Sequence, residues 1–79
     1  MLRCHMPESR LKEIADNADM IVNGYAFTRD GDNIRIFNLD TCKAALMTAG
    51  RKIIESSMDD IGLSIAMGYI EKNGHFIGL

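Results

Sequence analysis

The sequence predicts a small α+β domain in which two β-hairpins form one antiparallel sheet packed on helices. Three features support this: an amphipathic segment near the N-terminus, an Asp-Gly pair between two apolar runs, and a long alternation of large and small side chains in the last third. A chain of 79 residues is long enough for one domain, so we expect residues 1–79 to form a single unit with the order αββαββ.

The first element is expected to be a helix over residues 7–18. Pro7 suits the first helical position, because the N–H group that proline lacks has no partner there in any helix. A narrow apolar stripe at helical spacing follows, and it consists of Leu11, Ile14, Ala15 and Ala18. Residues 1–6 precede this helix and are expected to form a flexible N-terminal segment.

A β-hairpin is expected next. Residues 20–28 are rich in β-branched and aromatic side chains, which favour a strand. Asp30 and Gly31 then form a dipeptide that is typical of a hairpin turn, and residues 34–37 return as the second strand.

A second helix is expected over residues 41–56. The short polar side chains that suit its N-cap are Asn38, Asp40 and Thr41. The apolar residues that recur at helical spacing are Cys42, Ala45, Leu46, Ala49 and Ile53. Met47 and Ile54 widen this stripe beyond what one sheet face requires, which indicates a second contact surface.

The last third of the chain admits two interpretations. Large side chains alternate with small ones over residues 61–70, and an Asn-Gly pair follows at 73–74, which predicts a second hairpin. The alternative is a helix at the start of this segment, which gives the order αββααβ. Residues 57–60 fit the capping-box pattern, but Gly62 and Gly68 would each destabilise such a helix by about 1 kcal/mol relative to alanine.

The two halves of the chain share a short pattern. Gly24-Tyr25 and Gly68-Tyr69 each precede a predicted turn, and each predicted hairpin follows a predicted helix. Duplication of one αββ unit is therefore an open hypothesis, on which the expected order of elements does not depend.

No pattern in the sequence points to catalysis, a metal or a cofactor. The residue types that bind zinc occur as Cys4, His5, Cys42 and His75. Their spacing lacks the short chelating loop of a zinc site. Cys42 also lies on the expected apolar stripe, where a thiol normally packs without reacting. We therefore expect no catalytic, cofactor-binding or metal-binding residues, and a protein that is not an enzyme.

Charge and hydropathy set further limits. The net charge is −2 and the isoelectric point is near 5.5, whereas proteins that bind nucleic acid or anionic membranes usually carry clustered Lys and Arg. No apolar run is long enough to cross a membrane, and no apolar signal-peptide segment follows Met1. We expect a cytoplasmic protein that does not bind membranes, and nucleic acid is not its expected partner.

The sequence favours a small non-enzymatic interaction module that forms a homodimer or binds an unidentified protein. The wide apolar arc of residues 41–56 and the bare alternate positions of residues 61–70 suit self-association through the sheet and the second helix. The residues expected at this interface are Met47, Ile54, Met58, Ser64 and Ala66. The alternative is a small dimeric nucleic-acid-associated regulator, whose cations would be Arg29, Arg35, Arg51 and Lys52.

Overall fold

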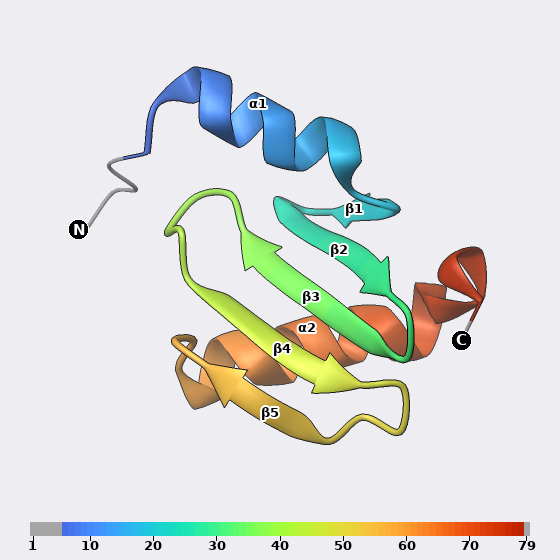
Figure 1. Cartoon of the computed structure of the whole chain (residues 1–79). Helices are drawn as coiled ribbons and strands as arrows, with labels where there is room; N and C mark the ends of the chain where they lie inside the picture. The colour runs from blue at the N-terminus through green and yellow to red at the C-terminus, as the bar shows by residue number, and fades with distance from the viewer. Residues whose placement is uncertain (1–5, 79) are drawn as a thin grey trace.

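The computed structural model describes residues 6–78 and contains two α-helices, five strands and one short 3₁₀ helix. The helices are α1 (Glu8–Asn17), α2 (Asp60–Asn73) and the 3₁₀ helix η1 (Gly74–Ile77). The strands are β1 (Met20–Val22), β2 (Tyr25–Asp30), β3 (Asn33–Asn38), β4 (Ala44–Thr48) and β5 (Ile53–Ser56). In Figure 1, α2 lies behind the sheet and α1 lies along its upper edge, beside β1 and β2. The predicted α+β class, with an antiparallel sheet packed on helices, is confirmed.

The five strands form one antiparallel sheet in which each strand pairs with its neighbours in the sequence, in the order β1-β2-β3-β4-β5. The sheet is therefore a meander, built from short connections alone. The hairpin predicted at Asp30 and Gly31 is confirmed. Its strands β2 and β3 pair from Tyr25 opposite Asn38 to Asp30 opposite Asn33.

The single strand predicted over residues 20–28 is wrong, because a tight turn divides it into β1 and β2. Asn23 and Gly24 both have positive φ angles, of 48° and 82°, as a type I′ hairpin turn requires. Asn-Gly is a dipeptide that favours this turn, so the sequence carried the signal. The apolar residues on both sides concealed it.

The hydrophobic core lies between α2 and one face of the sheet. Alternate residues of β2, β3 and β4 point to this face, because successive side chains of a strand point to opposite sides. Ala66 and Ile70 of α2 pack against them and are at most 1% exposed. The sheet residues of this core are Phe27, Ile34, Ile36, Ala45 and Met47.

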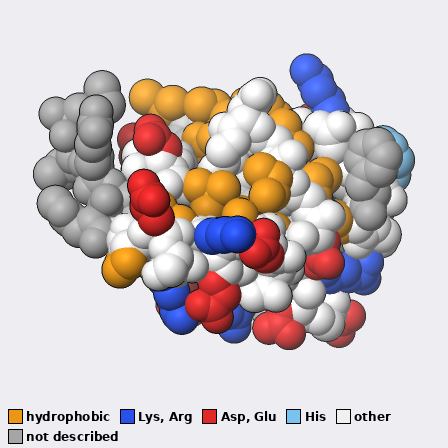
Figure 2. Space-filling model, turned by 90° about the horizontal axis from the view of Figure 1, so that it is seen from above, with side chains coloured by type: hydrophobic (Ala, Val, Ile, Leu, Met, Phe, Trp, Pro, Cys, Tyr) orange, Lys and Arg blue, Asp and Glu red, His pale blue; other side chains and the backbone are white. Residues whose placement is uncertain are grey.

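The predicted first helix is confirmed as α1, which covers part of the opposite face of the sheet. Its apolar stripe is only half-buried, where the helix contacts β2. Ala26 of β2 is 1% exposed, whereas Ile21 of β1 is 49% exposed. Figure 2 looks from above onto the edge along which α1 lies in Figure 1, and it shows hydrophobic side chains near the middle with most of the charged side chains below them. The flexible segment predicted before α1 lies, except for Met6, outside the described residues.

The helix predicted over residues 41–56 is wrong, because this segment forms β4, a turn and β5. Ala45 and Met47 of β4 face the core, whereas Ala44 and Leu46 face the opposite side of the sheet. A strand that is apolar on both faces shows no alternation, and its pattern resembles a wide helical stripe.

The strand predicted over residues 61–70 is also wrong, and the alternative helix is confirmed as α2. Asp59 caps this helix, because its Oδ1 atom accepts a hydrogen bond from the N–H group of Gly62 at 2.7 Å. Gly74, expected in a turn, has a helical φ angle of −58° at the end of α2. The second half of the chain therefore has two strands followed by a helix, and it does not repeat the first half.

Arg29 connects the β2–β3 hairpin to the C-terminal part of the chain. Its Nη1 atom donates hydrogen bonds to the carbonyl oxygens of Ile77, at 3.0 Å, and Gly78, at 2.9 Å. Its Nε atom donates to the carbonyl oxygen of Gly31 at 3.2 Å, and its backbone N–H group donates to Oδ2 of Asp19 at 2.7 Å. One side chain thus holds η1 beside the sheet.

Ile70→Ala is expected to lower the free energy of unfolding by about 2–5 kcal/mol, because it leaves a cavity where a side chain is now 1% exposed. Ile65→Ala is the matched control on the same helix. Ile65 is 41% exposed, so its loss is expected to cost less than about 1 kcal/mol. Urea unfolding at low micromolar concentration measures both values. Equal losses would contradict the placement of α2.

Gly68→Ala is expected to raise the free energy of unfolding by about 1 kcal/mol, because alanine favours a helix and a Cβ atom at this position meets nothing within 4 Å. Gly62→Ala is the control. A Cβ atom there would lie 3.1 Å from Oδ1 of Asp59, the atom that caps the helix, so a smaller gain is expected. Thermal unfolding at low micromolar concentration, where association contributes little, compares the two variants, and a lower Tm for Gly68→Ala would argue against the helix.

Arg29→Ala is expected to lower the free energy of unfolding by about 1–2 kcal/mol, because it removes three hydrogen bonds from a charged group that is largely exposed. Hydrogen exchange is expected to accelerate over residues 74–78. Arg35→Ala is the control, since its ion pair with Asp30 is exposed and is worth about 0–1 kcal/mol. Unchanged exchange over residues 74–78 in Arg29→Ala would show that Arg29 does not hold this segment.

Candidate functional site

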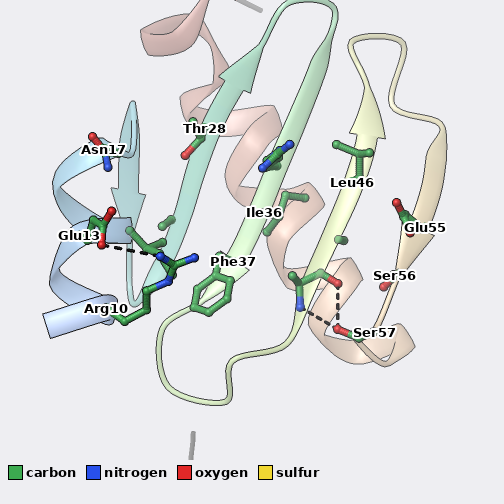
Figure 3. Close-up of a pocket in the computed structure, with 15 residues that line it drawn as sticks. Arg10, Glu13, Asn17, Thr28, Ile36, Phe37, Leu46, Glu55, Ser56 and Ser57 are labelled. Atoms are coloured by element: carbon green, nitrogen blue, oxygen red, sulfur yellow. Dashed lines mark hydrogen bonds and ion pairs between the residues drawn. The ribbon is translucent and has the colours of Figure 1, made fainter. Parts of the chain in front are cut away.

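A groove of about 730 Å³ lies on the face of the sheet that α2 does not cover. Figure 3 shows α1 along one side of this groove and β5 along the other, with the strands β2 to β4 between them and α2 behind the sheet. We refer to this feature as the sheet groove.

The floor of the sheet groove is formed by two rows of side chains that cross the strands. In the first row, Ala26, Phe37 and Ala44 lie opposite one another on β2, β3 and β4. In the second row, the cross-strand partners are Thr28, Arg35, Leu46 and Glu55. The first row is wholly apolar and the second is mixed, so the floor combines apolar contact area with charges of both signs.

The wall of the groove on the α1 side carries charged and polar side chains. Arg10, Glu13 and Asn17 line it together with Ile14. Arg10 and Glu13 form an ion pair with a nitrogen–oxygen distance of 3.8 Å, and both side chains are 62% exposed. Such an exposed pair contributes about 0–1 kcal/mol to stability, so both groups can be rearranged by a partner at little cost.

The opposite wall is held by backbone and hydroxyl hydrogen bonds. The hydroxyl of Ser57 accepts a hydrogen bond from the N–H group of Ala44 at 2.9 Å and donates one to its carbonyl oxygen at 3.2 Å. The N–H group of Ser57 also donates to that carbonyl oxygen at 2.8 Å. This fixes the end of β5 against β4, so the wall is part of the sheet itself.

The groove offers contact surface and exposed charges. Its ionisable side chains are Arg10, Glu13, Arg35 and Glu55. Within residues 6–78, no group of three or more His, Cys, Asp or Glu side chains is placed to hold a metal ion. The chemistry that these lining residues support is the binding of a partner through apolar packing and surface ion pairs.

The structure separates the five residues expected at an interface. Met47 and Ala66 are core residues with 0% exposure, which corrects their expected placement on a contact surface. Ile54 is 51% exposed at a β-bulge of β5, and Ser64 is exposed on α2. Met58 is half-buried and packs against the core. The two wrong placements follow from the wrong secondary structure of these segments.

Residues that sequence reasoning did not place at an interface form the observed surfaces. Phe37 and Leu46 lie in the sheet groove, and Ile61 and Ile65 are exposed on α2, by 71% and 41%. The sequence feature that could have pointed to these surfaces is the abundance of apolar residues in β4 and α2. Only knowledge of their true secondary structure assigns these residues to outer faces.

The cations considered for nucleic acid do not form a surface of one sign. Arg29 holds the C-terminal segment, Arg35 pairs with Asp30 at 3.6 Å, and Arg51 pairs with Glu71 at 3.5 Å. A nucleic-acid site needs clustered positive charge, so this arrangement gives the nucleic-acid alternative little support.

Two further observations concern location. No helix within residues 6–78 has the length and apolar content needed to cross a membrane. Cys42 lies in the β3–β4 connection rather than on a helical stripe, and it is disulfide-bonded. The cytoplasmic location stays a prediction.

The fold and the groove together define a small α+β domain with a five-stranded meander, one helix covering the sheet and an open groove on the other side. Residues 8–77 match a family of unknown function, DUF7723, and the chain belongs to this family. No curated protein and no solved structure matches the chain.

Proposed function

We propose that this protein is a non-enzymatic interaction module that binds an amphipathic helix of a partner protein in the sheet groove. The observation that carries the proposal is the apolar surface of Phe37, Ala44 and Leu46 on the groove floor, which α1 leaves uncovered although it packs over neighbouring β2. Apolar surface of this kind, bordered by polar side chains, is typical of a protein-binding site.

The dimensions of the groove suit one helix. Neighbouring strands are about 4.8 Å apart, so β3, β4 and β5 span about 10 Å. A helix with its side chains is about 10–12 Å across, and packed helices lie about 8–10 Å apart. One helix beside α1 would therefore cover the three strands and complete a second layer on the sheet.

The charges of the groove suit a partner with both signs on its polar flanks. Arg10 and Arg35 provide positive charge, and Glu13 and Glu55 provide negative charge. An amphipathic helix has a narrow apolar stripe with charged residues on either side, which can pair with these groups. A nucleic acid would meet the two carboxylates as well as the two cations.

The edges of the sheet favour binding to the face over the addition of a strand. β1 has three residues, and β5 carries a register shift near Leu46 and Met47 where it pairs with β4. Short edge strands and bulges hinder pairing with another chain. The open face is thus the better surface for a partner.

Leu46→Glu is expected to abolish helix binding while the domain stays folded, because Leu46 is half-buried on the open face and outside the core under α2. The probe is a displayed library of amphipathic 14-residue helical peptides, selected on the wild-type protein. Selected peptides are expected to shift the amide resonances of Phe37, Ala44 and Leu46. Leu46→Glu is expected to weaken their binding at least about tenfold.

Ile21→Glu is the matched control, since Ile21 is 49% exposed on β1 and does not line the groove. Its peptide affinity is expected to stay at the wild-type value. Selection that yields no peptide, or peptides that shift only residues of α2, would overturn the proposal. Binding of random duplex DNA with a strong salt dependence would replace it with the nucleic-acid alternative.

A further inference from the structure

The helix α2 is apolar on two opposite sides, although only one side is covered. Leu63, Ala66, Met67 and Ile70 face the core. The residues that follow the other side of the helix, at spacings of four, three and four, are Ile61, Ile65, Gly68 and Lys72. A surface helix of a monomer normally carries polar residues on its outer side, so the two isoleucines need an explanation.

The exposure of this outer face is high for large apolar residues. The relative exposure is 71% for Ile61 and 41% for Ile65. They stand one helical turn apart and therefore form one continuous apolar patch. Neither isoleucine lines the sheet groove, so this patch is separate from it. Both border a smaller pocket beside the first turns of α2, which Tyr25 and Asn38 also line.

Gly68 gives an independent indication that another molecule covers this face. Glycine inside a helix is destabilising relative to alanine, and such a residue usually permits close approach of a neighbour. Within this chain a Cβ atom at Gly68 would meet nothing within 4 Å. The space beside Gly68 is therefore open within the described fold, and a neighbouring molecule can approach the helix backbone there.

We propose that α2 of a second copy of this chain packs antiparallel on this outer face. With the two-fold axis between residues 66 and 67, Ile65 of each copy lies opposite Gly68 of the other. The large isoleucine side chain then packs against a residue that has no side chain. Ile61 of each copy then lies opposite Lys72, whose aliphatic stem can pack on it. Because the pair is two-fold symmetric, each of these contacts occurs twice in the dimer.

Charge complementarity selects a second copy in the antiparallel direction. Asp60 stands at the N-terminal end of α2 and Lys72 stands in its last turn. In the antiparallel pair the ammonium group of Lys72 comes to the carboxylate of Asp60 of the other copy, at both ends of the interface. A parallel pair would place like charges together. The sequence of α2 is thus complementary to itself only when it is reversed.

Sedimentation velocity between about 5 and 500 µM tests the dimer, because a single helix pair is a small interface with an expected Kd in the micromolar range. The wild-type chain is expected to pass from 8.8 kDa to twice that mass. Ile65→Glu is expected to raise the Kd at least about tenfold. Ile54→Glu is the control on β5, where Ile54 is 51% exposed and outside this face, and it is expected to leave the Kd unchanged.

A charge exchange tests the antiparallel register without removing apolar area. Asp60→Lys and Lys72→Asp are each expected to raise the Kd several-fold, and the double variant is expected to return it to within about threefold of wild type. Circular dichroism checks that each variant is folded. Failure of the double variant to recover would overturn the antiparallel pairing.

The dimer proposal and the groove proposal are contradicted by different results. A wild-type chain that stays at 8.8 kDa over the whole range would overturn the dimer, whatever peptides the groove binds. A dimer that survives Ile65→Glu and is lost in Leu46→Glu would place self-association in the sheet groove and overturn the role of α2.

Discussion

The whole domain depends on the burial of one sheet face under α2. A five-stranded meander cannot cover its own apolar face, and α2 is the helix that lies across it. Burying a side chain such as Phe27 or Ile70 stabilises the fold by about 1.5–3 kcal/mol, whereas an exposed ion pair gives about 0–1 kcal/mol. The three ion pairs seen among the described residues are exposed, so apolar packing decides stability. Tyr69 extends this contact, because its ring packs edge to face on Tyr25 with centroids 5.6 Å apart.

This arrangement leaves two apolar surfaces on opposite sides of the molecule. The core side of α2 is fully used, while its outer side carries Ile61 and Ile65. On the other side of the sheet, α1 covers β2 but leaves Phe37 and Leu46 at the floor of the groove. A dimer through α2 would point two grooves outward. A partner with two matching helices would then bind more tightly than a partner with one, because its second helix binds intramolecularly, at a high effective concentration.

The parts of the fold that could be predicted from the sequence depend on local signals. Pro7 and the stripe ending at Ala18 specify α1, and Gly31, whose φ angle is 61°, specifies the β2–β3 turn. The signals that failed were periodicities. β4 is apolar on both faces and was taken for a helix, and α2 has alternating large and small residues and was taken for a strand. The periodicity of apolar residues indicates secondary structure only when an element has one buried side and one solvent-exposed side.

The elements that periodicity misassigned are those in which the proposals place the binding surfaces. β4 breaks the alternation because Leu46 lines the groove while Met47 fills the core. α2 breaks the amphipathic pattern because Ile65 faces outward while Ala66 is buried. The expected interface therefore included two core residues, Met47 and Ala66, and missed the groove. A second apolar face is what defeats a periodicity argument, and it is also the feature on which both proposed contacts rest.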